Sequence, residues 1–115
     1  AVWHGRELYE KTPPDERGRR LHRAGERGPL EPWRLLAQNF VAAGPGAVFL
    51  VTTLEPPAVL LALSPDTGAH AGQILKAVVE GLGGRGGGNA QLAQASLPDA
   101  VRAAEAARQI LDRLG

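Results

Sequence analysis

Apolar positions repeat with a helical period in three stretches of the chain. The repeat after Pro32, a residue suited to the first turn of a helix, places on one face Trp33, Leu36, Ala37, Phe40 and Val41. The clearest repeat is an unbroken apolar stripe made of Ala71, Ile74, Leu75, Val78, Val79 and Leu82. The third stretch, residues 99–114, is alanine-rich and a strong helix former. The pattern therefore predicts three helices.

Continuous apolar runs predict two strands. Residues 47–53 and 58–64 fit strands that are buried on both faces. The link between them is short enough for a hairpin, although its two prolines favour a looser connection than a tight turn. Residues 18–24 form a weaker strand candidate, and residues 1–12 are typical of a short helix. This order predicts an α/β domain with a small mixed β-sheet flanked by helices and a glycine-rich loop after the central helix.

Composition limits the classes of protein that remain. The chain has 115 residues, of which 43% are hydrophobic, so we expect one globular domain. Cysteine is absent, which excludes disulfides, thiolate metal sites and thiol catalysis. No apolar run approaches the roughly 18 residues of a membrane span, and no leader pattern is present, so the expected location is cytoplasmic. The chain begins with Ala1 and contains no methionine, which indicates a piece of a longer protein.

The charge distribution is nearly balanced. The net charge is +1. Residues 1–34 carry eight basic and six acidic side chains, whereas residues 35–115 carry five and six. The locally basic segment 17–27 is explained by a solvated face at least as often as by a phosphate contact. Bulk charge alone therefore does not predict a nucleic-acid-binding protein.

Glycines gather directly after the clearest helix. Six of the eight residues from Gly81 to Gly88 are glycine, with Arg85 among them. One interpretation is structural, a left-handed helix end followed by a sharp turn. The other is that the glycines expose backbone amides to a phosphate, with Arg85 beside them and a helix beginning between Asn89 and Ala95. Neither a Walker loop nor a dinucleotide fingerprint fits, because no Gly-Lys-Ser/Thr follows and the segment comes after a helix rather than a strand.

The segment 70–95, HAGQILKAVVEGLGGRGGGNAQLAQA, resembles the C-terminal domain of alanyl-tRNA synthetases, the DHH-associated domain that is shared with DHH-type phosphoesterases. The features that match are Ala71-Gly72, Lys76, the glycine run of residues 83–88 around Arg85, and Ala93-Gln94-Ala95. The resemblance covers about residues 18–115. It leaves residues 1–17 as a helical remnant or linker from an upstream region.

The resemblance implies a non-catalytic module that contacts the elbow of a tRNA, with alanine-specific tRNA as the suspected partner and self-association as a further property. The whole protein would be an alanyl-tRNA synthetase-like ligase or an editing hydrolase. The nucleic-acid-binding residues that it implies are Gly83, Gly84, Arg85, Gly86, Gly87, Gly88, Asn89, Gln94 and Lys76. No cofactor, metal or membrane is expected.

Two other functions stay open. The first is the substrate-binding domain of a DHH-type phosphoesterase. The glycine run of those enzymes is typically followed by a histidine, and Asn89 in that position argues against this branch. The second is a purely structural dimerisation module, which nothing in the sequence rejects.

The remaining polar residues do not form a catalytic pattern. His4, His22 and His70 are scattered, no pair of carboxylates stands out, and the serines lack a nucleophile motif, so we expect neither catalytic nor metal-binding residues. Arg85 either contacts a phosphate or base or bonds helix-end carbonyls. Lys76 reaches the glycines only if the chain folds back; otherwise it is a surface partner of Glu80.

Overall fold

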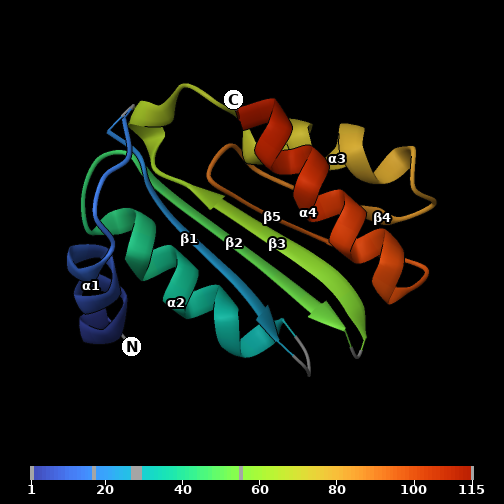
Figure 1. Ribbon diagram of the computed structural model, residues 1–115, viewed down its shortest axis with the longest axis horizontal. Coiled ribbons are helices and arrows are strands. Elements are labelled where there is room, and N and C mark those ends of the chain that lie inside the picture. The colour runs from blue at the N-terminus through green and yellow to red at the C-terminus, as the bar shows by residue number, and fades with distance from the viewer. Residues whose placement is uncertain (1, 17, 27–29, 55, 115) are drawn as a thin grey trace.

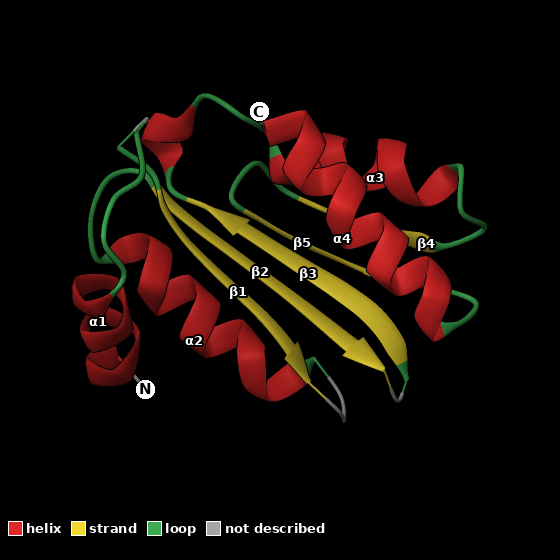
Figure 2. Ribbon diagram, in the orientation of Figure 1, coloured by secondary structure: helices red, strands yellow, loops and turns green. Residues whose placement is uncertain are grey.

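Five strands form one mixed sheet with helices on both faces (Figures 1 and 2) in the computed structural model, which describes residues 2–16, 18–26, 30–54 and 56–114. In sheet order the strands are β1 (Arg20–Glu26), β2 (Ala47–Leu54), β3 (Pro57–Leu63), β5 (Leu92–Ser96) and β4 (Arg85–Gly88). The pair β1–β2 is parallel and the other three pairs are antiparallel. The helices are α1 (Val2–Lys11), α2 (Glu31–Ala42), α3 (Ala71–Glu80) and α4 (Ala100–Leu114), with a 3-10 turn at Pro65–Thr67. The predicted fold class is confirmed.

The core has two parts, one on each face of the sheet. Side chains of β2 and β3 that point to one face, such as Leu50 and Leu61, pack against α3 and α4. The alternate side chains, such as Phe49 and Leu60, pack against α2 and α1. Both strands are therefore buried on both faces, as their continuous apolar runs predicted.

Helix α1 packs on α2. The ring of Tyr9 meets the edge of Phe40 with the centroids 5.7 Å apart, and its hydroxyl donates to the Pro45 carbonyl at 2.7 Å. A Cβ at Gly5 would lie 2.4 Å from Cβ of Asn39, so only glycine lets the two helices approach this closely. The short helix predicted within residues 1–12 is confirmed.

Two arginines of the basic segment hold helix ends. Arg19 donates to the carbonyl of Leu114 at the end of α4. Arg20 donates to the carbonyl of Tyr9 near the end of α1 at 3.0 Å, and its guanidinium lies 4.5 Å from the centre of the Tyr9 ring. Cations near the C-terminus of a helix satisfy its last carbonyls and complement its dipole. These two side chains are therefore engaged within the fold.

The segment after α3 differs from the prediction. The chain forms the hairpin β4–β5 where a glycine-rich loop and a helix beginning between Asn89 and Ala95 were expected, so the helix prediction is wrong. In β5 the apolar Ala93 and Ala95 point into the core beside α3 and α4, while Gln94 points to the other face. The connection between β2 and β3 is also tighter than predicted, since Leu54 pairs with Pro57; Glu55 lies outside the described residues.

Candidate nucleic-acid interface

Gly83 and Gly84 end helix α3. Gly83 has a φ of 75°, in the left-handed region, and the amide of Gly84 donates to the carbonyl of Val79 at 2.9 Å. A hydrogen bond from an amide to the carbonyl five residues earlier, with a left-handed glycine just before the donor, is a common way for a helix to end. The structural interpretation of the glycine run therefore holds for these two residues.

Gly86 and Gly88 allow close packing of the hairpin. A Cβ at Gly86 would lie 2.3 Å from Cβ of Ala95, the residue with which it pairs across β5. A Cβ at Gly88 would lie 2.2 Å from the carbonyl oxygen of Leu92. Both distances are far below van der Waals contact, so a side chain at either position would displace backbone.

Helix α3 begins directly against the β4–β5 turn. The amides of Ala71 and Gly72 donate to the carbonyls of Ala90 and Asn89, each at 2.9 Å. A Cβ at Gly72 would meet the carbonyl oxygen of Gly88 at 2.7 Å. The first amides of this helix are therefore used inside the protein and are not offered to an anion.

Within β4, Gly87 is the glycine at which a side chain would not clash with a neighbour. A Cβ there would meet nothing within 4 Å, and its φ is not positive. It pairs with Gln94, so it shares the sheet face of that side chain, opposite α3. A bare backbone at this position keeps the outer part of the sheet open to an approaching molecule.

Arg85 is exposed at the start of β4, on the same face as Gly87. Its guanidinium makes no hydrogen bond or ion pair with the residues that the structure describes. The alternative in which it bonds helix-end carbonyls is thus not seen within that part of the chain. The side chain is available to an anion.

Lys76 lies on α3 between two points where this helix touches residues 84–88. One turn before it, Gly72 meets Gly88, and one turn after it, Val79 meets Gly84. The chain therefore does fold back, so that α3 and β4 run side by side in opposite directions. Lys76 is exposed, and no ion pair joins it to Glu80 among the described residues.

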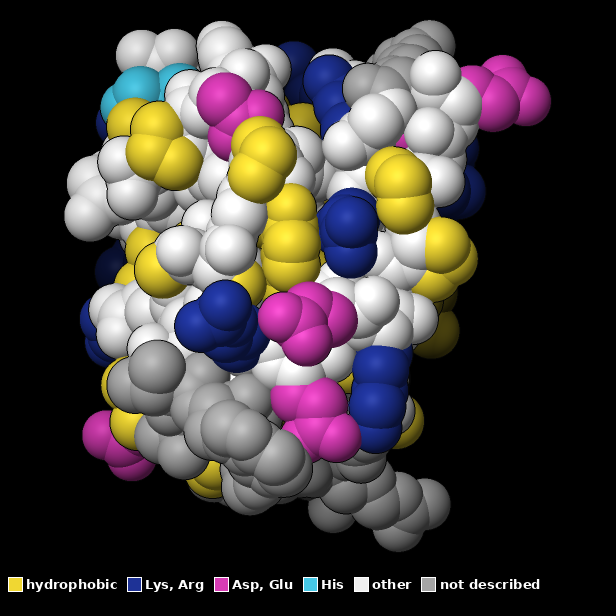
Figure 3. All heavy atoms as spheres, turned by 90° about the vertical axis from the view of Figure 1, so that its left-hand side faces the viewer, with side chains coloured by type: hydrophobic (Ala, Val, Ile, Leu, Met, Phe, Trp, Pro, Cys, Tyr) yellow, Lys and Arg dark blue, Asp and Glu magenta, His cyan; other side chains and the backbone are white. Residues whose placement is uncertain are grey.

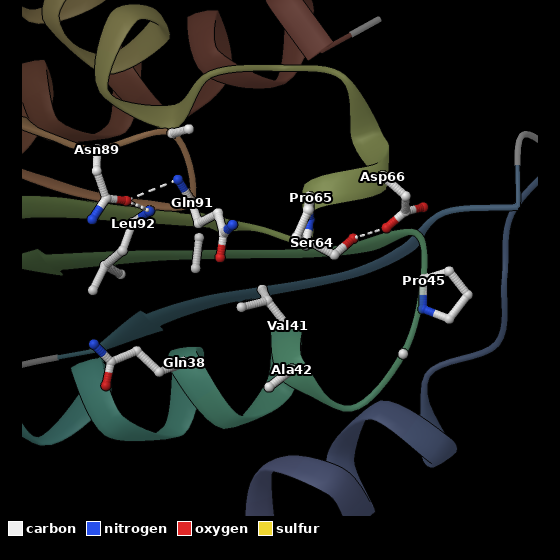
Figure 4. Close-up of a pocket in the computed structure, with 13 residues that line it drawn as sticks. Gln38, Val41, Ala42, Pro45, Ser64, Pro65, Asp66, Asn89, Gln91 and Leu92 are labelled. Carbon is white, nitrogen blue, oxygen red and sulfur yellow. Dashed lines mark hydrogen bonds between the residues drawn. The ribbon is translucent and has the colours of Figure 1, made fainter.

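Two hollows lie between α2 and the β4–β5 hairpin, on the face opposite α3. The arginine pocket, about 440 Å³, is lined by Glu31, Arg34, Arg85, Gln94 and Ser96, with Leu30, Pro56, Ala58, Gly86 and Ala95 completing its wall. The turn pocket, about 870 Å³, lies near the other end of α2 and includes Gln38, Val41, Asp66, Asn89 and Leu92 (Figure 4). The predicted residues Arg85, Gly86 and Gln94 thus meet in one pocket, and Asn89 lies in the other.

Comparison with protein families matches residues 42–114 to the DHHA1 domain. The chain belongs to the DHHA1 domain family. Among solved structures, the C-Ala domain of alanyl-tRNA synthetase from Aquifex aeolicus superposes with a TM-score of 0.68 at 23% identity, covering 82% of this chain and 88% of that chain. No curated protein matches the sequence. The family expected from the glycine run and the Ala-Gln-Ala tail is confirmed, and both lie inside the matched range.

In this DHHA1 domain Asn89 closes the β4–β5 turn. Its Oδ1 accepts hydrogen bonds from the amides of Gln91 and Leu92, both at 2.9 Å (Figure 4). This is the turn geometry that asparagine favours by bonding the backbone two residues on. The carbonyl of its side chain is therefore committed to the fold, whereas its Nδ2 group makes no hydrogen bond with the described residues.

Gln94 and Arg34 give the arginine pocket of the DHHA1 domain its polar character. Oε1 of Gln94 is buried and has no hydrogen-bond partner among the described residues. Arg34 was not predicted as a site residue. Sequence reasoning could not find it, because it is one cation on the polar face of α2, and only the fold brings it to β4.

Ser64 and Asp66 in the turn pocket are tied to the ends of the strands. The hydroxyl of Ser64 donates to Oδ1 of Asp66 at 2.6 Å (Figure 4), and the amide of Gly46 donates to Oδ2 at 2.9 Å. These bonds, that of Ser64 first, hold the pKa of Asp66 below its ordinary value. Both side chains therefore stabilise the turn that follows β3.

The rest of the DHHA1 domain supplies no other obvious site. Within the described ranges no three His, Cys, Asp or Glu side chains gather as metal ligands. No helix of that same part is long and apolar enough to cross a membrane. The face beside α1, at the left of Figure 1, interleaves basic, acidic and hydrophobic side chains (Figure 3). The described side chains of that face form no broad basic patch of the kind that attracts nucleic acid.

Proposed function

We propose that this DHHA1 domain is a non-catalytic tRNA-binding module of an alanyl-tRNA synthetase or a related alanyl-tRNA editing protein, and that it contacts the tRNA elbow through β4. Family membership and the fold shared with the C-Ala domain support the class of protein. The Arg85 guanidinium, which has no partner among the described residues, and the open Gly87 support the contact surface.

The observation that carries the proposal is that β4 ends the sheet, so its outer edge has no neighbouring strand in the described part of the chain. The amide of Asn89 donates to Leu92 across the hairpin at 3.0 Å. In an antiparallel pair such bonded positions alternate with unbonded ones. The register therefore turns the amides of Gly87 and Arg85 toward β5 and those of Gly86 and Gly88 outward. Outward amides beside a cation suit a phosphate oxygen.

Catalysis is assigned to other parts of the protein. The side chains of Ser64 and Asp66 are hydrogen-bonded to each other, and both also accept backbone hydrogen bonds at the strand ends. We therefore propose that this chain alone has no ligase, hydrolase or nuclease activity. The substrate-binding role of a DHH-type phosphoesterase is less well supported, because the carbonyl of Asn89 is committed to its turn.

The test is tRNA affinity measured by fluorescence anisotropy at fixed salt. Arg85→Ala removes one arginine contact and should weaken binding by about 1–3 kcal/mol, with a salt dependence reduced by about one charge. Arg113→Ala is the matched control, since it removes the same charge from the last turn of α4. Equal affinities of the two folded variants would defeat the proposal.

A further inference from the structure

The arginine pocket joins two cations from distant parts of the chain. Arg34 comes from α2 and Arg85 from β4, and both line the same hollow. No carboxylate pairs with either guanidinium in the described part of the chain. Two unpaired guanidinium groups at one pocket can bind one phosphate with several charge-assisted hydrogen bonds.

The same pocket also holds two hydrogen-bond acceptors. Oε1 of Gln94 is buried and has no donor in the described part of the chain, and the exposed Glu31 lines the α2 side of the pocket. A buried acceptor without a donor destabilises a fold, so a group that supplies an N–H from outside would relieve it. Phosphate alone would satisfy the two arginines but not these acceptors.

We propose that the arginine pocket binds one nucleotide, with its phosphate on Arg34 and Arg85 and an N–H edge of its base on Gln94 and Glu31. The pocket volume of about 440 Å³ lies within the usual size of small-ligand sites. The inference deepens the proposed function: the nucleotide is an unstacked residue of the RNA strand that lies along β4. Arg34 thereby becomes a second phosphate-binding residue, and Gln94 becomes the residue that reads the base.

The proposal is tested by titrating the ¹⁵N-labelled chain with three probes at millimolar concentration: adenosine 5′-monophosphate, ribose 5-phosphate and adenosine. The monophosphate should shift the side-chain amide of Gln94 together with the arginine Nε resonances. Ribose 5-phosphate should shift only the arginines. If the monophosphate leaves all of these resonances unchanged, the pocket does not bind a nucleotide.

Two variants separate binding from folding. Arg34→Ala should weaken binding of the monophosphate about fivefold or more, whereas Arg113→Ala should not change it. Gln94→Leu should weaken binding to a similar degree, yet leave the unfolding midpoint unchanged or raised, because it removes an unpartnered buried acceptor. A lowered midpoint with unchanged affinity would make Gln94 a structural residue and overturn its assigned role.

The same variants, measured with tRNA, separate this inference from the proposed function. If Arg85→Ala weakens tRNA binding while Arg34→Ala and Gln94→Leu change neither ligand, the pocket assignment is wrong and the β4 surface stands. If the monophosphate binds through the pocket and tRNA does not bind at all, the pocket takes a free nucleotide and the proposed function fails.

Discussion

Two adjacent glycines of β4 should respond to alanine in opposite directions. At Gly86 the new Cβ would lie 2.3 Å from Cβ of Ala95 and 2.3 Å from the carbonyl oxygen of Gln94, so backbone must move. Overpacking of this kind destabilises by about 1–3 kcal/mol, of which about 0.4–1 is offset by the stiffer unfolded chain. At Gly87 the Cβ meets nothing, and only the stabilising effect of about 0.4–1 kcal/mol remains.

The difference between the two variants can be read by thermal and urea unfolding. For a domain of this length, 1 kcal/mol moves the melting temperature by about 4 °C, so Gly86→Ala should melt about 4–12 °C below Gly87→Ala. Equal urea m-values would confirm that the surface exposed on unfolding is unchanged, so that a shift of the midpoint reports a change in stability. If Gly86→Ala were as stable as Gly87→Ala, the close pairing of β4 with β5 would be refuted.

Three further predictions concern the rest of the domain. Burial beside Phe40 and Phe49 lowers the pKa of His22 from its ordinary 6.5, so the uncharged form of His22 favours folding and the free energy of unfolding should fall as the pH drops below 6.5. If the free energy of unfolding of His22→Leu depended on pH with the same slope, this prediction would be contradicted. Asp99 caps α4 by accepting from the amide of Arg102 at 2.8 Å, so Asp99→Ala should lower stability by about 1 kcal/mol in urea, and an unchanged midpoint would disprove the cap. Self-association, expected from the family resemblance, should appear in analytical ultracentrifugation as a mass that rises with concentration; a strictly monomeric mass would exclude it.

Elements with a side-chain pattern could be predicted from the sequence. The apolar stripe from Ala71 to Leu82 marks α3, and the continuous run at residues 47–53 marks β2, because each pattern reflects what the element buries. Strand β4 could not be found this way, since Gly86, Gly87 and Gly88 carry no side chains to show a period and glycine is depleted in strands. Its strand conformation is set by pairing with β5 and packing under α3.

Only those residues of the candidate site that lie within one short segment of the sequence could be predicted. Arg85 and Gln94 belong to the segment that carries the family resemblance, and both line the arginine pocket. Arg34 is about fifty positions away in the chain and becomes a neighbour through the fold alone. Burial alternates along β5, with Ala93 and Ala95 buried and Gln94 only partly so, which is the pattern of a strand. Five residues are too few for this pattern alone to predict a strand from the sequence.

The central claim, that RNA lies against β4, is tested most directly by tRNA affinity of Gly87→Val. The valine side chain would have open space and the backbone there has strand conformation, so the domain should fold. The same side chain would lie on the sheet face that Arg85 shares and would hold an RNA strand away. Gly25→Val is the matched control, because Gly25 is equally open on β1 at the opposite edge of the sheet. If RNA lies against β4, Gly87→Val should weaken tRNA binding about fivefold or more, as for loss of a contact of about 1–3 kcal/mol, while Gly25→Val should bind like the unaltered domain. Wild-type affinity in a well-folded Gly87→Val protein would contradict it.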